Sequence, residues 1–385
     1  MKWSLIQRKL ARVDRVIDKA IAGAEMAGAV VLSHVPRDGE VVEYAVVRGL
    51  AALRPERIPM ARETIFDLAS LTKPLATATA VMLLADEGAL QLDDPVAKHL
   101  PSFAERDKDA VTVRHLLTHS SGLKPWRAYH EIVLEKERKT GKRLLGTPEA
   151  RELIVDRIVR SSLVHEPGAA AVYGDLDFIT LGAVVEAVTR RPLDEFCAER
   201  IFAPLGLEHT RFIRSDGTGS PLSEPERRAF AATENCPWRG RIVVGEVHDP
   251  NTAAMGGVAG HAGLFAPADD VMRFALALLD VWHGRSDVFP RTLLKTFTTR
   301  QKLPPGSDWA LGWDTPTAGA SSSGSHFSEN SIGHLGFTGT SLWIDLEREA
   351  VVVMLTNRVH LFAKKSKFTL RPQVHDLIME ASLAG

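Results

Sequence analysis

Strand-like patterns occur near both ends of this chain of 385 residues, and helical patterns fill the long stretch between them. Runs of β-branched residues bounded by turn residues predict strands at residues 28–34, 41–47, 341–345 and 350–356. Helical spacing of apolar residues prevails between them, from about residue 73 to residue 254. Because strands far apart in sequence can share one sheet, the helical middle is predicted to be an insertion. A groove between sheet and helices is then the expected place for a site.

Composition and charge exclude several classes of function. The formal net charge is −1, which gives no reason to expect binding to nucleic acid or to an anionic membrane surface. Two cysteines, Cys197 and Cys236, are too few for a disulfide framework or a zinc set, and two buried thiols are favoured over one bridge. There is no glycine-rich phosphate loop, so no nucleotide cofactor is expected.

The first twenty residues are typical of an amphipathic helix. Charged residues between Arg8 and Lys19 interrupt the apolar run that a secretion signal would need. Leu10, Val13 and Ile17 lie on one side of the expected helix. No run elsewhere is long enough to span a bilayer. We therefore expect a cytoplasmic protein with no membrane partner, and the oligomeric state is left open.

A helical pattern begins directly after Ser70, with Pro74 in its first turn. Ser70 would then lie at the start of a helix, where free backbone N–H groups carry a partial positive charge. Lys73 follows one turn later on the same face, and a buried lysine with a lowered pKa can take the serine proton. Ser-x-x-Lys is the pattern of serine acyl-enzyme hydrolases. The alternative is an ordinary helix cap with an exposed lysine nearby.

A second Ser-x-x-Lys match at Ser121 lacks this context. Gly122 lies inside the match and Pro125 follows it, so the stretch is predicted to be a loop and Ser121 a turn residue. The sequence contains no G-x-S-x-G nucleophile elbow, which excludes an α/β-hydrolase. Ser70 is therefore the predicted nucleophile.

Tyr173 and Asp175 form the second candidate segment, on a short loop before a predicted helix. As a phenolate, or sharing a proton with Lys73, Tyr173 is a plausible second proton carrier. Asp175 is expected to face the same cleft and to accept a hydrogen bond from Lys73 or from the substrate. The alternative is a buried tyrosine followed by an aspartate that caps the helix.

Residues 333–340 form a glycine-rich stretch before the predicted strand at 341–345. Glycines let the backbone pass close to a ligand, so this edge can offer one N–H to a developing oxyanion, opposite the N–H of Ser70. His334 would place a donor, or a positive charge when protonated, beside the substrate. The alternative is a strand entry with an exposed histidine.

The ordered motifs Ser70 to Lys73, Tyr173 to Asp175 and His334 to Gly336 resemble those of the serine β-lactamase and penicillin-binding protein superfamily. The chain is most similar to the branch that holds class C β-lactamases, related DD-peptidases and esterases of the same fold. Further supporting stretches are residues 64–73, 114–123, 166–168, 256–265 and 336–340.

The resemblance implies an α/β (α+β) fold, in which an antiparallel sheet flanked by helices receives a mostly helical inserted domain. Residues 1–73 and 255–385 would form the sheet domain, and residues 74–254 the helical domain. It also implies acyl transfer through Ser70, with Lys73 and Tyr173 handling the proton. The backbone N–H groups of Ser70 and Phe337 would form the oxyanion hole. No metal or other cofactor is implied.

Several other side chains are candidates for the cleft. Asp175, His334 and Gly336 are predicted to bind substrate through the motifs that contain them. Trp126 and Tyr129 are candidates for an aromatic wall, with surface packing as the alternative, and His261 is as easily structural as cleft-lining. His115 and His119 have a spacing that can bind zinc on a helix, but no glutamate of an H-E-x-x-H pattern accompanies them, so a structural or cleft-lining role is favoured over metal binding.

The chain departs from the resembled pattern at two positions. Asp175 stands where β-lactamases usually have asparagine, and its carboxylate would repel an anionic substrate unless Lys73 neutralises it. His334 stands where class C β-lactamases usually have lysine, and a histidine is mostly neutral at pH 7. Both changes lower the expectation of an efficient β-lactamase.

The favoured hypothesis is therefore a serine hydrolase that acts as a carboxylesterase on small acyl esters, with weak or no β-lactam hydrolysis. A D-alanyl-D-alanine carboxypeptidase or a class C-like β-lactamase is the alternative. A penicillin- or peptide-binding protein that forms no acyl-enzyme is the third hypothesis. The expected partner in each case is a small ester, amide or β-lactam.

Overall fold

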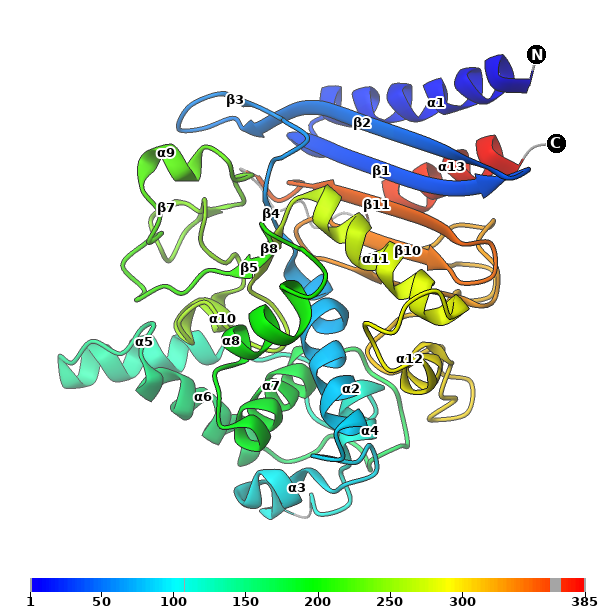
Figure 1. Ribbon diagram of the computed structural model, residues 1–385. Coiled ribbons are helices and arrows are strands. Elements are labelled where there is room, and N and C mark those ends of the chain that lie inside the picture. The colour runs from blue at the N-terminus through cyan, green and yellow to red at the C-terminus, as the bar shows by residue number, and fades with distance from the viewer. Residues whose placement is uncertain (1, 107, 361–367, 384–385) are drawn as a thin grey trace.

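The computed structural model describes residues 2–106, 108–360 and 368–383. Its largest sheet has six strands in the order β3-β2-β1-β11-β10-β9, and every pairing in it is antiparallel (Figure 1). The strands are β1 (Gly28–Arg37), β2 (Glu40–Ala52), β3 (Ile58–Pro59), β9 (Ser331–Leu335), β10 (Ser341–Asp345) and β11 (Ala350–Thr356). The two ends of the chain meet where β1 pairs with β11, with Ala29 opposite Thr356. The prediction that the terminal strands share one sheet is confirmed.

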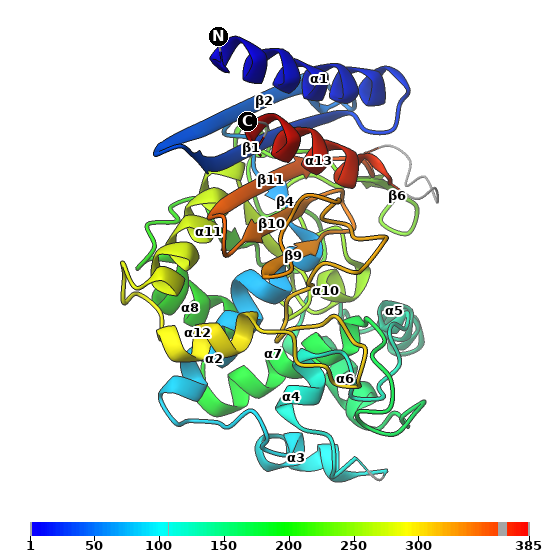
Figure 2. The same cartoon turned by 90° about the vertical axis from the view of Figure 1, so that its right-hand side faces the viewer.

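Alternation along β1 explains why both faces of this sheet are covered. Val30 and Leu32 point into the core shared with the helical part, whereas Val31 and Val35 point into a second core on the opposite face. Helices α1 (Lys2–Ala22) and α13 (Leu370–Leu383) lie side by side on that opposite face (Figure 2). Helix α11 (Ala268–His283) packs against β1 and β11 from the other side.

Helices dominate the middle of the chain, as predicted. They are α2 (Thr79–Asp86), α3 (Val96–His99), α4 (Val113–Leu117), α5 (Tyr129–Thr140), α6 (Pro148–Val159), α7 (Asp175–Thr189), α8 (Leu193–Cys197), α9 (Glu224–Arg227) and α10 (Pro250–Ala254), followed by α12 (Arg291–Thr298). The side chain of Thr147 caps α6 by accepting a hydrogen bond from the N–H of Ala150. The exact domain boundaries stay a prediction.

A small three-stranded sheet lies between the large sheet and the helical part (Figure 1). It consists of β4 (Phe66–Asp67), β8 (Leu264–Ala266) and β5 (Arg211–Phe212), in that order. Because β4 ends three residues before Ser70, this sheet holds the start of the nucleophile segment in place.

Residues 214–240 are rich in proline, glycine, serine and charged residues, a composition that predicts a long surface excursion, and this prediction is wrong for their C-terminal half. Phe230, Thr233 and Cys236 are buried. Backbone hydrogen bonds join Ile65 to Ala229 and Ala231, and Ala232 to Ala51, and the short strands β6 (Asn235–Cys236) and β7 (Arg241–Ile242) pair with each other. Backbone pairing of this kind is independent of side-chain polarity, so composition did not reveal it.

Among the described residues, no helix combines the length and the apolarity needed to cross a bilayer.

Candidate active site

The nucleophile segment is a sharp turn followed by a helix, and the predicted single helix is divided. Residues Ala69–Leu71 form a 3₁₀ turn, Lys73–Ala78 form a π-helical turn, and α2 begins at Thr79. Ala69 has a φ of 48°, a left-handed conformation that is strained for a residue with a side chain. π-helical turns of this kind often occur at functional sites.

The buried carboxylate of Asp67 stabilises this turn, and sequence reasoning did not identify it. Its oxygens accept hydrogen bonds from the N–H of Ala69 at 2.8 Å and from the N–H of His248 at 2.6 Å. Burial raises the pKa of Asp67, although the two backbone donors favour its charged form. An aspartate often forms a turn by accepting a hydrogen bond from the backbone N–H two residues later. Asp67 before Ala69 was therefore the sequence signal that could have predicted this turn.

Lys73 brings together the first two predicted motifs. Its Nζ lies 2.9 Å from Ser70 Oγ, 2.7 Å from the Tyr173 hydroxyl and 2.8 Å from Asp175 Oδ1. The lysine side chain is completely buried, and the side chain of Asp175 is 20% exposed. An ammonium group has three hydrogens, so each can be donated to one of these three oxygens.

The pKa of Lys73 is raised, which contradicts the predicted lowering. Burial alone would lower it, but the charge of Asp175 and the nearby Tyr173 oxygen, both also hydrogen-bonded to Nζ, raise it by more. The prediction considered burial without the distance to Asp175. Lys73 is therefore an ammonium at neutral pH, and its pairing with Asp175 explains how the cation is accommodated in the interior.

Tyr173 contacts rings that lie far away in sequence, and the residue is 41% exposed where it lines the cavity. It stacks on Trp309 with ring centroids 5.7 Å apart and meets the edge of His119 at 4.8 Å. Desolvation of its hydroxyl, which lies against the buried Lys73, raises the pKa of Tyr173, so its resting form is the phenol. Burial and the charge of Lys73 lower the pKa of His119 to about 3, so this ring is neutral and structural in its contacts, as favoured from sequence. Trp309 carried no sequence signal.

The glycine-rich segment after β9 is hydrogen-bonded to the residues that precede Ser70. Thr338 Oγ1 donates to the carbonyl of Asp67 at 2.8 Å, and Thr340 Oγ1 donates to the carbonyl of Leu68 at 3.0 Å. Among the described residues, no acceptor pairs with the backbone N–H of Phe337. The arrangement suits a pair of backbone donors at Ser70 and Phe337, and that assignment stays a prediction.

Gly336 allows this close approach. A Cβ atom at position 336 would lie 2.0 Å from Thr340 Oγ1 and 2.6 Å from the carbonyl oxygen of Leu68. Both distances are too short for any side chain, so glycine is needed here for space. Gly336 thus acts through backbone placement.

His334 is buried, so the alternative of an exposed histidine is wrong. Its Nδ1 lies 2.9 Å from the carbonyl oxygen of Leu335 and must carry the proton, because a carbonyl only accepts. Burial, Lys73 and His119 lower the pKa of His334 well below its usual value. The neutral ring therefore leaves Nε2 as an acceptor and offers no positive charge to a substrate carboxylate.

Most of the predicted site residues line one cavity of about 990 Å³, but the completely buried Lys73 does not. Trp126, Trp238 and Phe337 form aromatic parts of its wall, and the side chain of Trp126 is 49% exposed. Tyr129, the first residue of α5, is instead 2% exposed and packs in the main hydrophobic core, so its predicted place in the aromatic wall is wrong. The side chain faces the core because Tyr129 begins an amphipathic helix.

His261 also lines the cavity and is buried. Its Nε2 lies 2.9 Å from Asp249 Oδ1, and one donor atom each of His261, Asp249 and Asp175 lie within 4.8 Å of one another. Such a group has the composition of a metal site. Asp175 already bonds the Lys73 ammonium, however, so a metal ion would have to compete with that fixed positive charge, and we assign none here.

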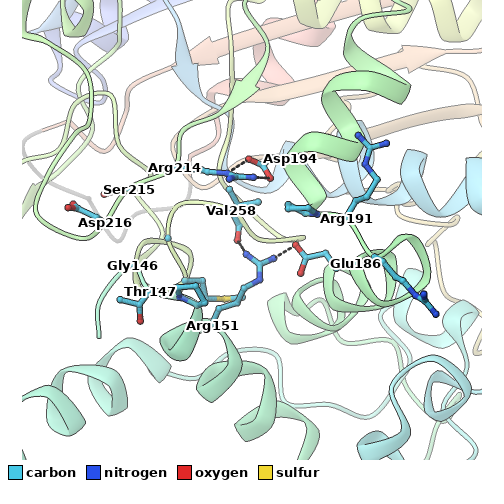
Figure 3. Close-up of a pocket in the computed structure, with 15 residues that line it drawn as sticks. Gly146, Thr147, Arg151, Glu186, Arg191, Asp194, Arg214, Ser215, Asp216 and Val258 are labelled. Atoms are coloured by element: carbon cyan, nitrogen blue, oxygen red, sulfur yellow. Dashed lines mark hydrogen bonds and ion pairs between the residues drawn. The ribbon is translucent and has the colours of Figure 1, made fainter. Parts of the chain in front are cut away.

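A second cavity of about 620 Å³ lies beside α6 and α7 (Figure 3). Arg151 pairs with Glu186 at 2.6 Å, and Arg214 pairs with Asp194 (Figure 3). None of the predicted site residues lines this cavity. Because its central arginines are paired within the protein, it offers no comparable reactive group.

Known proteins are similar to this chain in sequence and in fold. The family model described as Beta-lactamase matches residues 13–375. A Bacillus subtilis (strain 168) protein named N-acetylmuramyl-L-alanine amidase is 32% identical, over 92% of this chain and 82% of its own length. A putative D-alanyl-D-alanine carboxypeptidase of Escherichia coli (strain K12) is 33% identical, over 77% of this chain and 70% of its own length.

Solved structures with a similar fold include members of related groups. EstCE1, a hydrolase with promiscuous acyltransferase activity, superposes with a TM-score of 0.72 at 25% identity and covers 97% of this chain and 99% of its own. The octameric penicillin-binding protein homologue from Pyrococcus abyssi has a TM-score of 0.69 at 24% identity, over 96% of this chain and 76% of its own, and shows the fold alone. With a family match over nearly the whole chain and relatives of this coverage, the chain belongs to the Beta-lactamase family.

Proposed function

We propose that this chain hydrolyses small esters through an acyl-enzyme on Ser70. The observation that carries the proposal is the contact of one buried ammonium, Lys73, with the Ser70 hydroxyl, the Tyr173 hydroxyl and the Asp175 carboxylate. Ser70, Tyr173 and Asp175 line the cavity of about 990 Å³, so a substrate can reach the hydroxyl nucleophile beside its proton carriers.

The contacts support a proton path in which each proton moves one place. Because an ammonium has no free lone pair, Lys73 first passes one proton to the Tyr173 oxygen, and the amine that results takes the proton of Ser70 as Oγ attacks the carbonyl carbon. Tyr173 in turn gives its proton to the leaving-group oxygen, so the alcohol departs neutral. The protonation states of Lys73 and Tyr173 are the same before and after, so the path is compatible with an ammonium and a phenol at rest. Water then attacks the acyl-enzyme by the reverse route.

The neutral His334 favours esters over anionic β-lactams, because it offers no cation where class C β-lactamases usually have lysine. Asp175 does not add to this preference, since its carboxylate is paired with the Lys73 ammonium at 2.8 Å. The experiment is hydrolysis of a nitrophenyl ester by the wild type and by Ser70→Ala, with mass spectrometry after a fluorophosphonate. We expect turnover to vanish in the variant and the label to lie on Ser70. Undiminished turnover in Ser70→Ala would remove the nucleophile assignment.

A second candidate function is hydrolysis of an amide in a cell-wall peptide. It is favoured by the names of two relatives, an N-acetylmuramyl-L-alanine amidase and a putative D-alanyl-D-alanine carboxypeptidase. A panel that compares short esters, N-acetylmuramyl-L-alanine, a D-Ala-D-Ala peptide and a cephalosporin at equal enzyme concentration separates the candidates. A kcat/KM for either amide far above that for the esters would replace the ester proposal.

A further inference from the structure

Arg371 lies at the start of α13, remote in sequence from the three motifs, yet it lines the cavity of the candidate site. Its side chain runs behind the segment that follows β9. Nη2 donates hydrogen bonds to the carbonyl oxygens of Gly336 and Thr340, the second at 3.0 Å. The residue is only 8% exposed, and its Nε is buried without a hydrogen-bond partner.

The carbonyl of Gly336 and the N–H of Phe337 belong to the same peptide group. A cationic donor on the carbonyl oxygen draws electron density away from the amide nitrogen, which makes the N–H a stronger donor on the opposite side. This N–H is the second predicted donor to the oxyanion. The guanidinium of Arg371 thus bonds the carbonyl oxygen of the Gly336–Phe337 peptide, and the N–H of the same peptide is the predicted donor to the reacting carbonyl.

Arg371 has no carboxylate partner among the residues that the structure describes, and neither has its neighbour Arg358. Burial and the adjacent charge of Arg358 lower the pKa of Arg371 to about 9, so it is still a cation at neutral pH. A buried cation without a counter-ion is costly, and that cost needs a compensating negative charge. The oxyanion that forms during acyl transfer would provide it at this place.

We propose that Arg371 is a positioning residue of the oxyanion hole, which acts on the reaction through the Gly336–Phe337 peptide. The inference rests on the proposed acyl-enzyme at Ser70. Because Arg371 would not touch the substrate, it should affect the stabilisation of the transition state more than the binding of a neutral ester.

The chain offers a matched control. Arg358 also lines the cavity, but its Nε donates at 3.1 Å to the carbonyl of Phe337, which belongs to the next peptide. Arg358→Gln therefore removes an equal charge nearby without removing the donor to the Gly336 carbonyl. Arg371→Lys is the conservative variant, since a lysine keeps the charge and can reach one carbonyl.

The experiment measures kcat and KM for a neutral nitrophenyl ester, and the infrared carbonyl stretch of the acyl-enzyme, in the wild type and the three variants. We expect Arg371→Gln to lower kcat about tenfold, a part of the loss of ~10²-fold or more that follows removal of a whole donor. KM should change by less than about twofold. The acyl carbonyl stretch should move to higher frequency, Arg371→Lys should restore part of both effects, and Arg358→Gln should move the stretch clearly less.

Other outcomes overturn the inference. An unchanged carbonyl stretch in a folded Arg371→Gln variant would show that the peptide is not polarised by this residue. A raised KM for a carboxylate-bearing ester, with normal kinetics on the neutral ester, would show that Arg371 binds substrate instead. If Arg371→Gln does not fold, Arg371→Lys provides the test. An acyl carbonyl stretch at the wild-type frequency, together with a tenfold lower kcat in Arg371→Lys, would count against the proposed role of Arg371. A wild type that forms no acyl-enzyme on Ser70 would instead refute the proposed function.

Discussion

The charge of Lys73 is decided by Asp175, and this makes Asp175 the residue to change first. In Asp175→Asn the burial of Lys73 is no longer outweighed by a carboxylate, so the pKa of the ammonium should fall. The raised pKa keeps the ammonium present up to strongly alkaline pH in the wild type. We expect the alkaline limb of the kcat/KM profile to move to lower pH in the variant, and a pH titration with a nitrophenyl ester measures it. Identical pH profiles of kcat/KM in the wild type and Asp175→Asn would contradict the proposal that Asp175 sets the pKa of Lys73.

Tyr173 is predicted to deliver the proton to the leaving group, and leaving groups differ in how much they need it. Tyr173→Phe should lower kcat for an ethyl ester by about 10²-fold or more, within the usual range for a general acid. The loss should be smaller but still clear for a nitrophenyl ester, because nitrophenolate leaves without a proton whereas Ser70 still has to release its proton through Lys73 to Tyr173. An undiminished rate on the nitrophenyl ester would show that the Ser70 proton does not pass through Tyr173, and equal losses on both esters would show that Tyr173 does not protonate the leaving group.

At the scale of single residues, the sequence was sufficient to select Ser70, Lys73, Tyr173 and Asp175 as one group, which the structure places within hydrogen-bond distance of Lys73. It was not sufficient to predict the direction of the pKa shift of Lys73. That direction depends on a distance of 2.8 Å between side chains 102 positions apart, which no local pattern contains.

At the scale of elements, the segment between β9 and β10 is the part whose placement matters most. Gly336→Ala would force a Cβ against Thr340 Oγ1 and the Leu68 carbonyl. Overpacking of this kind costs about 1–3 kcal/mol and should displace the segment from Ser70. We therefore expect a lower melting temperature together with a loss of kcat larger than the stability change explains. Gly306→Ala, at an exposed glycine with a φ of 88° and no atom near the added Cβ, is the control, because it strains the backbone without a steric contact and should lower stability without the extra loss of kcat.

Elements with strong periodicity were predictable, and elements defined by contacts were not. The predicted strands at 341–345 and 350–356 coincide with β10 and β11. The helix after Ser70 is divided because the Asp67 carboxylate and the left-handed Ala69 shape its first turn. Residues 229–236 join the wall of the cleft through backbone pairing, which the composition of the segment does not encode.

At the scale of the whole molecule, the candidate site lies where the two ends of the chain and its middle meet. Ser70 comes from the first part, Tyr173 from the helical part and His334 from the last, and the pairing of β1 with β11 joins the first part of the chain to the last. The order of motifs along the chain predicted this assembly in outline. The substrate and the cytoplasmic location are not determined by the fold, and both stay predictions.

A buried acid behind the site should make the stability of the whole molecule depend on pH. Asp177 is buried on α7, accepts a hydrogen bond from Ser121 and lies 3.2 Å from Nδ1 of the neutral His119. Burial raises the pKa of Asp177 to about 8, far above the value of an aspartate in an unfolded chain. Between these two values the folded state holds a proton that the unfolded state has released.

The sign follows from this difference in bound protons. Because the folded state binds more protons, the contribution of Asp177 to the free energy of unfolding is present at low pH and is lost as the pH rises toward 8, by at most about 1.4 kcal/mol per pH unit. Asp177→Asn keeps the shape of the protonated acid and cannot ionise. We therefore expect its melting temperature, relative to that of the wild type, to increase steadily between pH 5 and pH 8 (about the window that the two pKa values span). A difference in melting temperature that is constant over this range would show that Asp177 is ionised in the folded protein, and that the carboxylate is compensated by Ser121, His119 and the charge of Lys73.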